Sequence, residues 1–214
     1  NRGFVADSMR RFAVVLPYGC WGTIIPKYVI DQYGSSDMVW VVYLTSVCTT
    51  VLGAHFLAVV VSSWVYKRGF KWESWALVSV LLFCTGLLLL VWAGNALLLP
   101  VAIAVFICGE VVMTPCFDET AKKHSSSSGM ATCMGLLHLV DGFGRMLGAV
   151  FALAAYAWIG DMGRSPWYWP VVVAVFLCTS SVLYIVAALI GRSSAVVAEA
   201  PPPSASRGDA LEVE

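Results

Sequence analysis

The sequence predicts an all-α, polytopic membrane protein in which six transmembrane helices form one bundle. Of its 214 residues, 59% are hydrophobic and only 12% are charged, against about 25% charged in soluble domains. Apolar segments follow one another along the chain, and each has the roughly 20 residues that a helix needs to cross a bilayer. Tryptophan residues mark several segment ends, as is typical of membrane interfaces. The chain is therefore expected to reside in a lipid bilayer.

These segments divide the chain into three parts. We expect a cytoplasmic N-terminal segment at 1–11, the six-helix bundle at 12–191 and a tail at 192–214. The tail is rich in Pro, Ala, Ser and acidic residues, a composition that predicts disorder. The six spans are expected at 12–30, 38–62, 74–94, 97–117, 130–158 and 168–190.

The first span contains helix-breaking residues, namely Pro17, Gly19, Gly22 and Pro26. A proline inside a helix removes a backbone hydrogen bond and bends the helix. Membrane helices tolerate this where neighbours or a cavity satisfy the freed carbonyl. The pattern predicts a twice-broken helix that is either a moving part that lines a cavity or a helix curved around a neighbour.

Positive charge lies mostly on one side of the predicted spans. Of the 13 Lys and Arg residues, ten fall on the side of the two termini. The opposite side carries Lys27 and Arg164, and Arg145 falls within a span. Because cytoplasmic connections carry the excess of Lys and Arg, both termini are predicted to be cytoplasmic. The ten are Arg2, Arg10, Arg11, Lys67, Arg68, Lys71, Lys122, Lys123, Arg192 and Arg207.

Four ionisable residues fall inside the fourth and fifth spans: Glu110, His138, Asp141 and Arg145. The last three recur at helical spacing and share one face. Counting depth at 1.5 Å per residue places Glu110 nearest to His138, while Asp141 is the i,i+4 partner of Arg145. These groups either form internal ion pairs or define a pathway for a substrate or a proton.

The fifth span also carries small residues, namely Gly135, Gly144, Gly148 and Ala152. The last three recur every four residues, which lets a second helix approach closely. This stripe indicates either a packing face or a hinge. The sixth span begins beside Trp167 and Trp169, which are expected to be interfacial anchors.

Several sequence stretches resemble the C-terminal half of a major facilitator superfamily transporter. These are the six-span layout, "TIIPKYVIDQYGSS", "SSWVYKRGFK" and the pair "GEVVMTP" and "GLLHLVDGFGRMLGAVFAL". The stretch "SSWVYKRGFK" resembles a degenerate basic loop motif around Lys67, Arg68 and Gly69, in which Gly69 and a base at Lys67 are retained. The resemblance implies two inverted three-helix repeats in this chain, and an N-terminal six-helix half as partner in a longer protein.

The implied function is proton-coupled transport of a small solute or drug by alternating access. The alternative is a non-transporting membrane protein, such as a receptor, a scaffold or an inactive half-transporter. A net charge of zero gives no basic field for nucleic acid, and no phosphate-binding glycine loop occurs. The "DGFG" stretch reverses the order that an intramembrane aspartyl protease requires, so we expect no enzyme. The seven cysteines lack metal-ligand spacing, and neither a metal nor a cofactor is expected.

Overall fold

The computed structural model describes residues 2–56, 72–92, 94–124, 129–159 and 167–199, and no strand occurs among them. The predicted all-α class is therefore confirmed for this part of the chain. Five helical segments are long and apolar enough to cross a bilayer, at 37–56, 74–92, 98–124, 130–158 and 168–191. They correspond to five of the six predicted spans.

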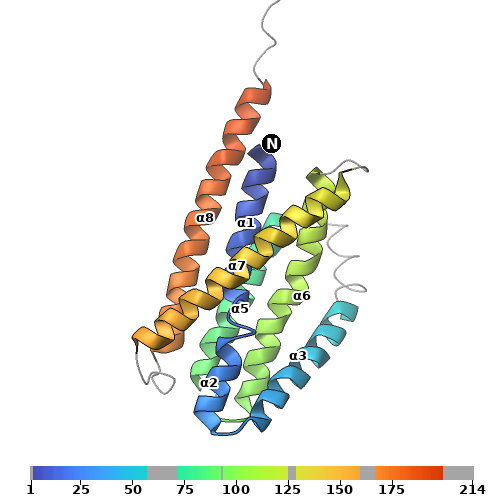
Figure 1. Ribbon diagram of the computed structural model, residues 1–214. Helices are drawn as coiled ribbons and strands as arrows, with labels where there is room; N and C mark the ends of the chain where they lie inside the picture. The colour runs from blue at the N-terminus through green and yellow to red at the C-terminus, as the bar shows by residue number, and fades with distance from the viewer. Residues whose placement is uncertain (1, 57–71, 93, 125–128, 160–166, 200–214) are drawn as a thin grey trace, which may run out of the picture.

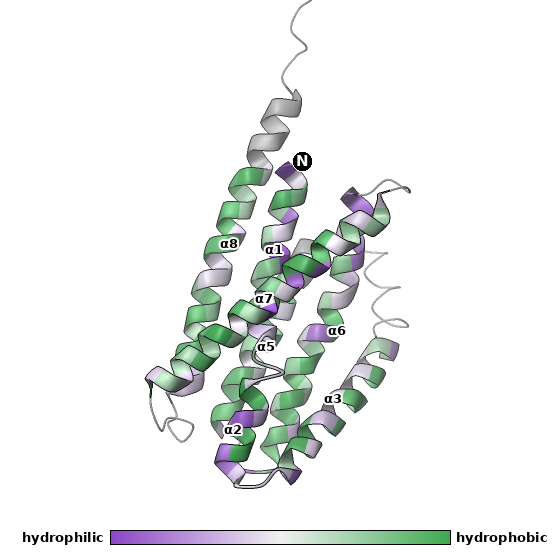
Figure 2. Cartoon of the chain, viewed as in Figure 1, coloured by the Kyte–Doolittle hydropathy of each residue, from purple (hydrophilic) through white to green (hydrophobic). Residues whose placement is uncertain are grey.

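The helices follow the order of the predicted spans, and Figure 1 shows them as a bundle of long, mostly antiparallel rods. Figure 2 shows that apolar residues dominate along these rods. The helices are α1 (Arg2–Tyr18), α2 (Ile24–Tyr33), α3 (Asp37–Phe56), α5 (Trp72–Leu89) with the 3-10 turn η2 (Leu90–Trp92), α6 (Leu98–His124), α7 (Met130–Trp158) and α8 (Tyr168–Glu199).

The residues of the remaining predicted span, 12–30, lie in α1, a turn and α2, which follow one another along the bundle (Figure 1). Neither helix is among the five that are long and apolar enough to cross a bilayer. A short turn separates them, and within it the backbone N–H of Gly19 donates to the carbonyl of Leu16. Pro17 lies in the last turn of α1. Pro26 lies in the first turn of α2, where a missing backbone N–H leaves no intrahelical bond unmade. The helix is thus interrupted once, whereas the sequence predicted two breaks.

Several boundaries differ from the predicted ones. Residues 2–11, predicted as a separate segment, are part of the continuous helix α1, and α8 continues past 191 to Glu199. α6 likewise runs past 117 to His124. These helix ends extend because Ala, Arg, Lys and Glu favour helix even in polar surroundings. The loop motif Lys67, Arg68 and Gly69 and the tail from 200 lie outside the described residues.

The hydrophobic core lies between α1, α5, α6 and α8. α5 and α6 pack closely because Gly86 leaves no side chain between them: a Cβ there would lie 2.7 Å from the backbone nitrogen of Phe106. α3 packs on the outside of α6 and turns most of its apolar side chains away from the chain, with Trp40 75% exposed. Such surface suits a lipid or protein neighbour better than water.

α7 crosses α1 at a contact formed by glycines (Figure 1). A Cβ on Gly148 would overlap with the carbonyl oxygen of Leu16, and one on Gly19 would lie 2.7 Å from the backbone nitrogen of Ala149. Gly144 faces Val15 at the same crossing. Gly135 has open space around it and takes no part in the crossing. The small-residue stripe is therefore a packing face between α7 and α1.

Candidate functional site

Ionisable side chains from α1, α6 and α7 gather within the apolar part of the bundle. They form two groups: an ion pair toward the start of α1, and a charged pair on either side of a tyrosine near the end of α1. α1 contributes Arg11 and Tyr18, neither of which the sequence singled out. The two residues are seven apart and therefore share one helix face. This spacing is the feature of the sequence that could have identified them as site residues.

The ion pair joins Arg11 of α1 to Asp141 of α7. The Arg11 Nε donates to Asp141 Oδ1 at 2.6 Å and the Arg11 Nη2 to Oδ2 at 2.5 Å. Both side chains are buried, at 4% and 10% exposed, and the guanidinium also lies 3.8 Å from the Phe117 ring centroid. This bidentate geometry is the strongest form of a carboxylate hydrogen bond. It locks α1 onto α7.

The predicted partner of Asp141 was Arg145, and this prediction is wrong. Because α7 crosses α1 beside Gly144, Arg145 meets Tyr18 while Asp141 meets Arg11. His138 lies on the open side of α7, 71% exposed, with its Nδ1 3.9 Å from Asp141 Oδ2. Glu110, which the sequence places nearest to His138 in depth, accepts a hydrogen bond from Tyr18 of α1.

The second group centres on Tyr18, which touches two opposite charges. Its hydroxyl donates to Glu110 Oε1 of α6 at 2.7 Å. The Arg145 guanidinium of α7 lies over its ring, 4.4 Å from the centroid, which is a cation–π contact. Glu110 is half-buried and Arg145 is exposed. Within the described part of the chain, neither charge belongs to an ion pair.

Aromatic rings surround Tyr18. It packs against Phe83 and Phe106, with ring centroids 5.6 and 6.2 Å away. Trp21, in the turn between α1 and α2, stacks on Phe106 at 6.0 Å and meets the edge of Tyr43 from α3. Trp21 is half-buried and Tyr43 is 41% exposed. The charged pair therefore borders an accessible aromatic surface.

A third cluster lies between the start of α1 and the end of α6. Asp7 is 2% exposed and accepts bonds from Arg10 at 2.8 Å, Lys123 at 3.0 Å and the His124 ring at 2.7 Å. A buried carboxylate requires such compensation. This cluster fastens α1 to α6.

The opposite end of the bundle has a contact between α2 and α7. Lys27 bonds Asp31 at 3.0 Å, and the Tyr156 hydroxyl of α7 donates to the same carboxylate. The hydrogen bond from Tyr156, and to a smaller extent the one from Lys27, lowers the pKa of Asp31 below its usual range. The bonds stabilise the carboxylate form and tie α2 to α7.

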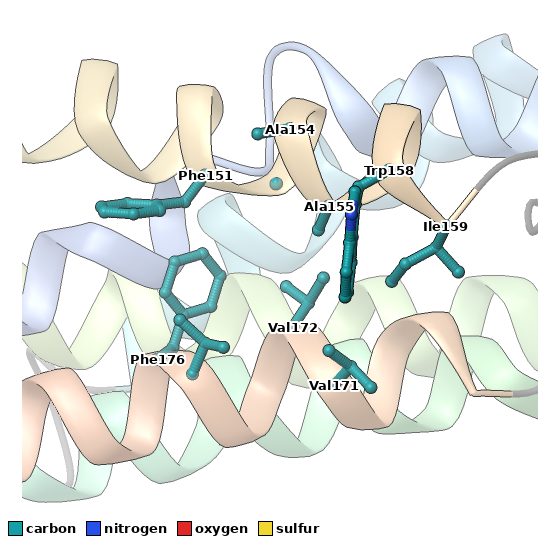
Figure 3. A pocket seen from close by; sticks show the side chains of 10 residues that line it. Phe151, Ala154, Ala155, Trp158, Ile159, Val171, Val172 and Phe176 are labelled. Carbon is teal, nitrogen blue, oxygen red and sulfur yellow. The ribbon is translucent and has the colours of Figure 1, made fainter.

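Two hollows in the surface are apolar. One, of about 300 Å³, lies between α7 and α8, where Phe151, Trp158, Val171 and Phe176 line it (Figure 3). The other lies between α1, α7 and α8 and is lined by residues such as Phe12 and Leu139. Neither is lined by an ionisable residue. No metal-binding group of three His, Cys, Asp or Glu residues exists among the described residues.

No protein-family model, no curated protein and no solved structure matches this chain.

Proposed function

We propose that this chain is a six-span half of a secondary transporter of the major facilitator type, with both termini cytoplasmic. It moves a small solute by alternating access and couples this movement to protons. α1 and α2 together form the first span, and a second six-helix half completes the transporter. The sequence resemblance, the interrupted first span and the charges on α1, α6 and α7 support this proposal.

One observation carries it: Glu110 lies in the middle of a long apolar helix without a cationic partner among the described residues. A carboxylate at membrane depth is expensive and commonly marks an ion or substrate pathway. Its hydrogen bond from Tyr18 holds it at the junction of α1 and α6. A group of this kind takes up a proton when the site faces one side and releases it when the site faces the other.

The test uses the full-length protein in proteoliposomes that carry an imposed pH gradient. Uptake of labelled glucose, phenylalanine, citrate and ethidium is measured together with the internal pH. We expect a solute whose uptake requires the gradient, and we expect Glu110→Gln to abolish that requirement. Glu119→Gln is the matched control on the same helix, because Glu119 lies in an exposed pair with Lys122. Gradient-driven uptake that is identical in the Glu110 variant would contradict the proton role.

A further inference from the structure

We propose that the site around Tyr18 binds a small zwitterion, whose ammonium group contacts Glu110 and whose carboxylate contacts Arg145. The ligand class is a free amino acid or a short peptide with an apolar side chain. This inference deepens the proposed function, since the zwitterion is then the transported solute.

The first argument is the state of the two charges. Glu110 and Arg145 carry opposite charges and touch the same tyrosine, yet they form no ion pair with each other in the described structure. A carboxylate accepts several hydrogen bonds and a guanidinium donates five. The contacts found for these two groups, one hydrogen bond and one ring contact, leave most of that capacity unused. Both groups are therefore available to a ligand.

The second argument is their separation. One tyrosine side chain bridges them, with its hydroxyl 2.7 Å from Glu110 Oε1 and its ring centroid 4.4 Å from Arg145 Cζ. The two charged groups are thus held on either side of a single tyrosine side chain. A ligand with a single positive charge would be repelled by Arg145, and one with a single negative charge by Glu110. A molecule that carries both charges a few bonds apart satisfies the two sites at once.

The third argument is the aromatic surface beside the charges. Trp21 and Tyr43 leave part of their rings uncovered next to Phe106. An apolar or aromatic side chain buries surface there and stacks on the rings. Phenylalanine joins the two charges and such a side chain in one small molecule, and it is the probe for this site.

Binding is measured on the full-length protein in lipid nanodiscs with tritiated L-phenylalanine and tritiated L-phenylalanyl-L-alanine, by scintillation proximity. Competitors are L-phenylalaninamide, which lacks the carboxylate, N-acetyl-L-phenylalanine, which lacks the ammonium, and tetraphenylphosphonium, a lipophilic cation. We expect saturable binding of at least one zwitterion, about tenfold or more tighter than either single-charge analogue. The tighter of the two zwitterions distinguishes an amino-acid site from a peptide site.

Two variants test which protein group contacts the ammonium of the ligand and which contacts its carboxylate. Glu110→Gln is expected to weaken zwitterion binding about tenfold and leave N-acetyl-L-phenylalanine unchanged. Arg145→Gln is expected to weaken the zwitterion equally and leave the amide unchanged. Glu119→Gln and Lys122→Gln, which change the same charges on the exposed end of α6, are expected to bind as the unaltered protein does. The analogue series needs no variant, so it decides the question even if a variant does not fold.

The proposal is overturned if neither zwitterion binds saturably, or if the amide or tetraphenylphosphonium binds as tightly as the better zwitterion. Gradient-driven uptake of another solute without zwitterion binding would refute this inference and leave the proposed function standing. Saturable zwitterion binding without proton-dependent uptake would support this inference and refute the proposed function.

Discussion

The ion pair between Arg11 and Asp141 gives the sharpest stability prediction. Replacing Asp141 with Asn leaves a buried guanidinium, 4% exposed, without its counter-charge. Removing one partner of a buried pair costs about 3–5 kcal/mol, which is two to four powers of ten in the unfolding equilibrium constant. Arg11→Met is expected to cost a similar amount, because it leaves the carboxylate alone. The double variant Arg11→Met/Asp141→Leu removes both charges and is expected to lie within about 1 kcal/mol of the unaltered protein.

The assay is reversible unfolding in mixed micelles at increasing dodecyl sulfate, followed by far-ultraviolet circular dichroism. The matched control is the exposed pair of Glu119 and Lys122 on α6, whose nitrogen and oxygen atoms are 3.0 Å apart. Each single change in that pair is expected to alter the free energy of unfolding by less than about 1 kcal/mol. The reasoning is refuted if the double variant of Arg11 and Asp141 loses the sum of the two single losses, because the residues would then not be coupled.

Two further predictions concern the helix crossing and the α2–α7 contact. Gly148→Ala is expected to lower the free energy of unfolding by about 1–3 kcal/mol, because its Cβ would overlap with the Leu16 carbonyl. Gly135→Ala is the control, since Gly135 has open space around it, and its free energy of unfolding is expected to stay unchanged. The unfolding assay described above compares the two variants. The lowered pKa of Asp31 means that its contribution to stability is present above the ordinary aspartate pKa and is lost as pH falls through the lowered value. Unfolding measured from pH 6 down to pH 2 is expected to show this acid loss, and Asp31→Asn and Tyr156→Phe are expected to reduce it; an unchanged acid limb in both would contradict the contact.

The helical class and five of the spans follow from local properties of the sequence. Segment length and apolar content decide whether a helix suits a bilayer, and neither depends on neighbours. The packing stripe of Gly144 and Gly148 could also be predicted, because a helix that packs closely needs small residues at four-residue spacing. The helix on which this stripe packs could not be predicted, since no local sequence pattern identifies the partner of a stripe.

The pairing of charges could not be predicted in the same way. The i,i+4 rule links Asp141 to Arg145 on an isolated helix, but the contact with α1 offers Asp141 a bidentate arginine instead. Which arginine reaches it depends on the angle and height of the crossing, and these are set by the overlap that Gly19 and Gly148 permit. The positive charge of Arg11 places it among the cations of the predicted N-terminal segment, whereas its seven-residue spacing from Tyr18 is the pattern that indicates a shared helix face.

The glycine contact between α1 and α7 has a mechanical consequence. On one side of this contact Arg11 of α1 bonds Asp141, and on the other side Asp31 of α2 accepts a hydrogen bond from Tyr156, so α7 is held to its neighbours at one point on each side of the glycine contact. A tilt of α7 about the glycine contact moves the two ends of α7 in opposite directions and strains both of these side-chain contacts. The turn between Tyr18 and Ile24 lies at the same level as this contact. α1 and α2 are therefore separate helices, and each is bonded to a different side of α7 rather than joined to it as one continuous helix.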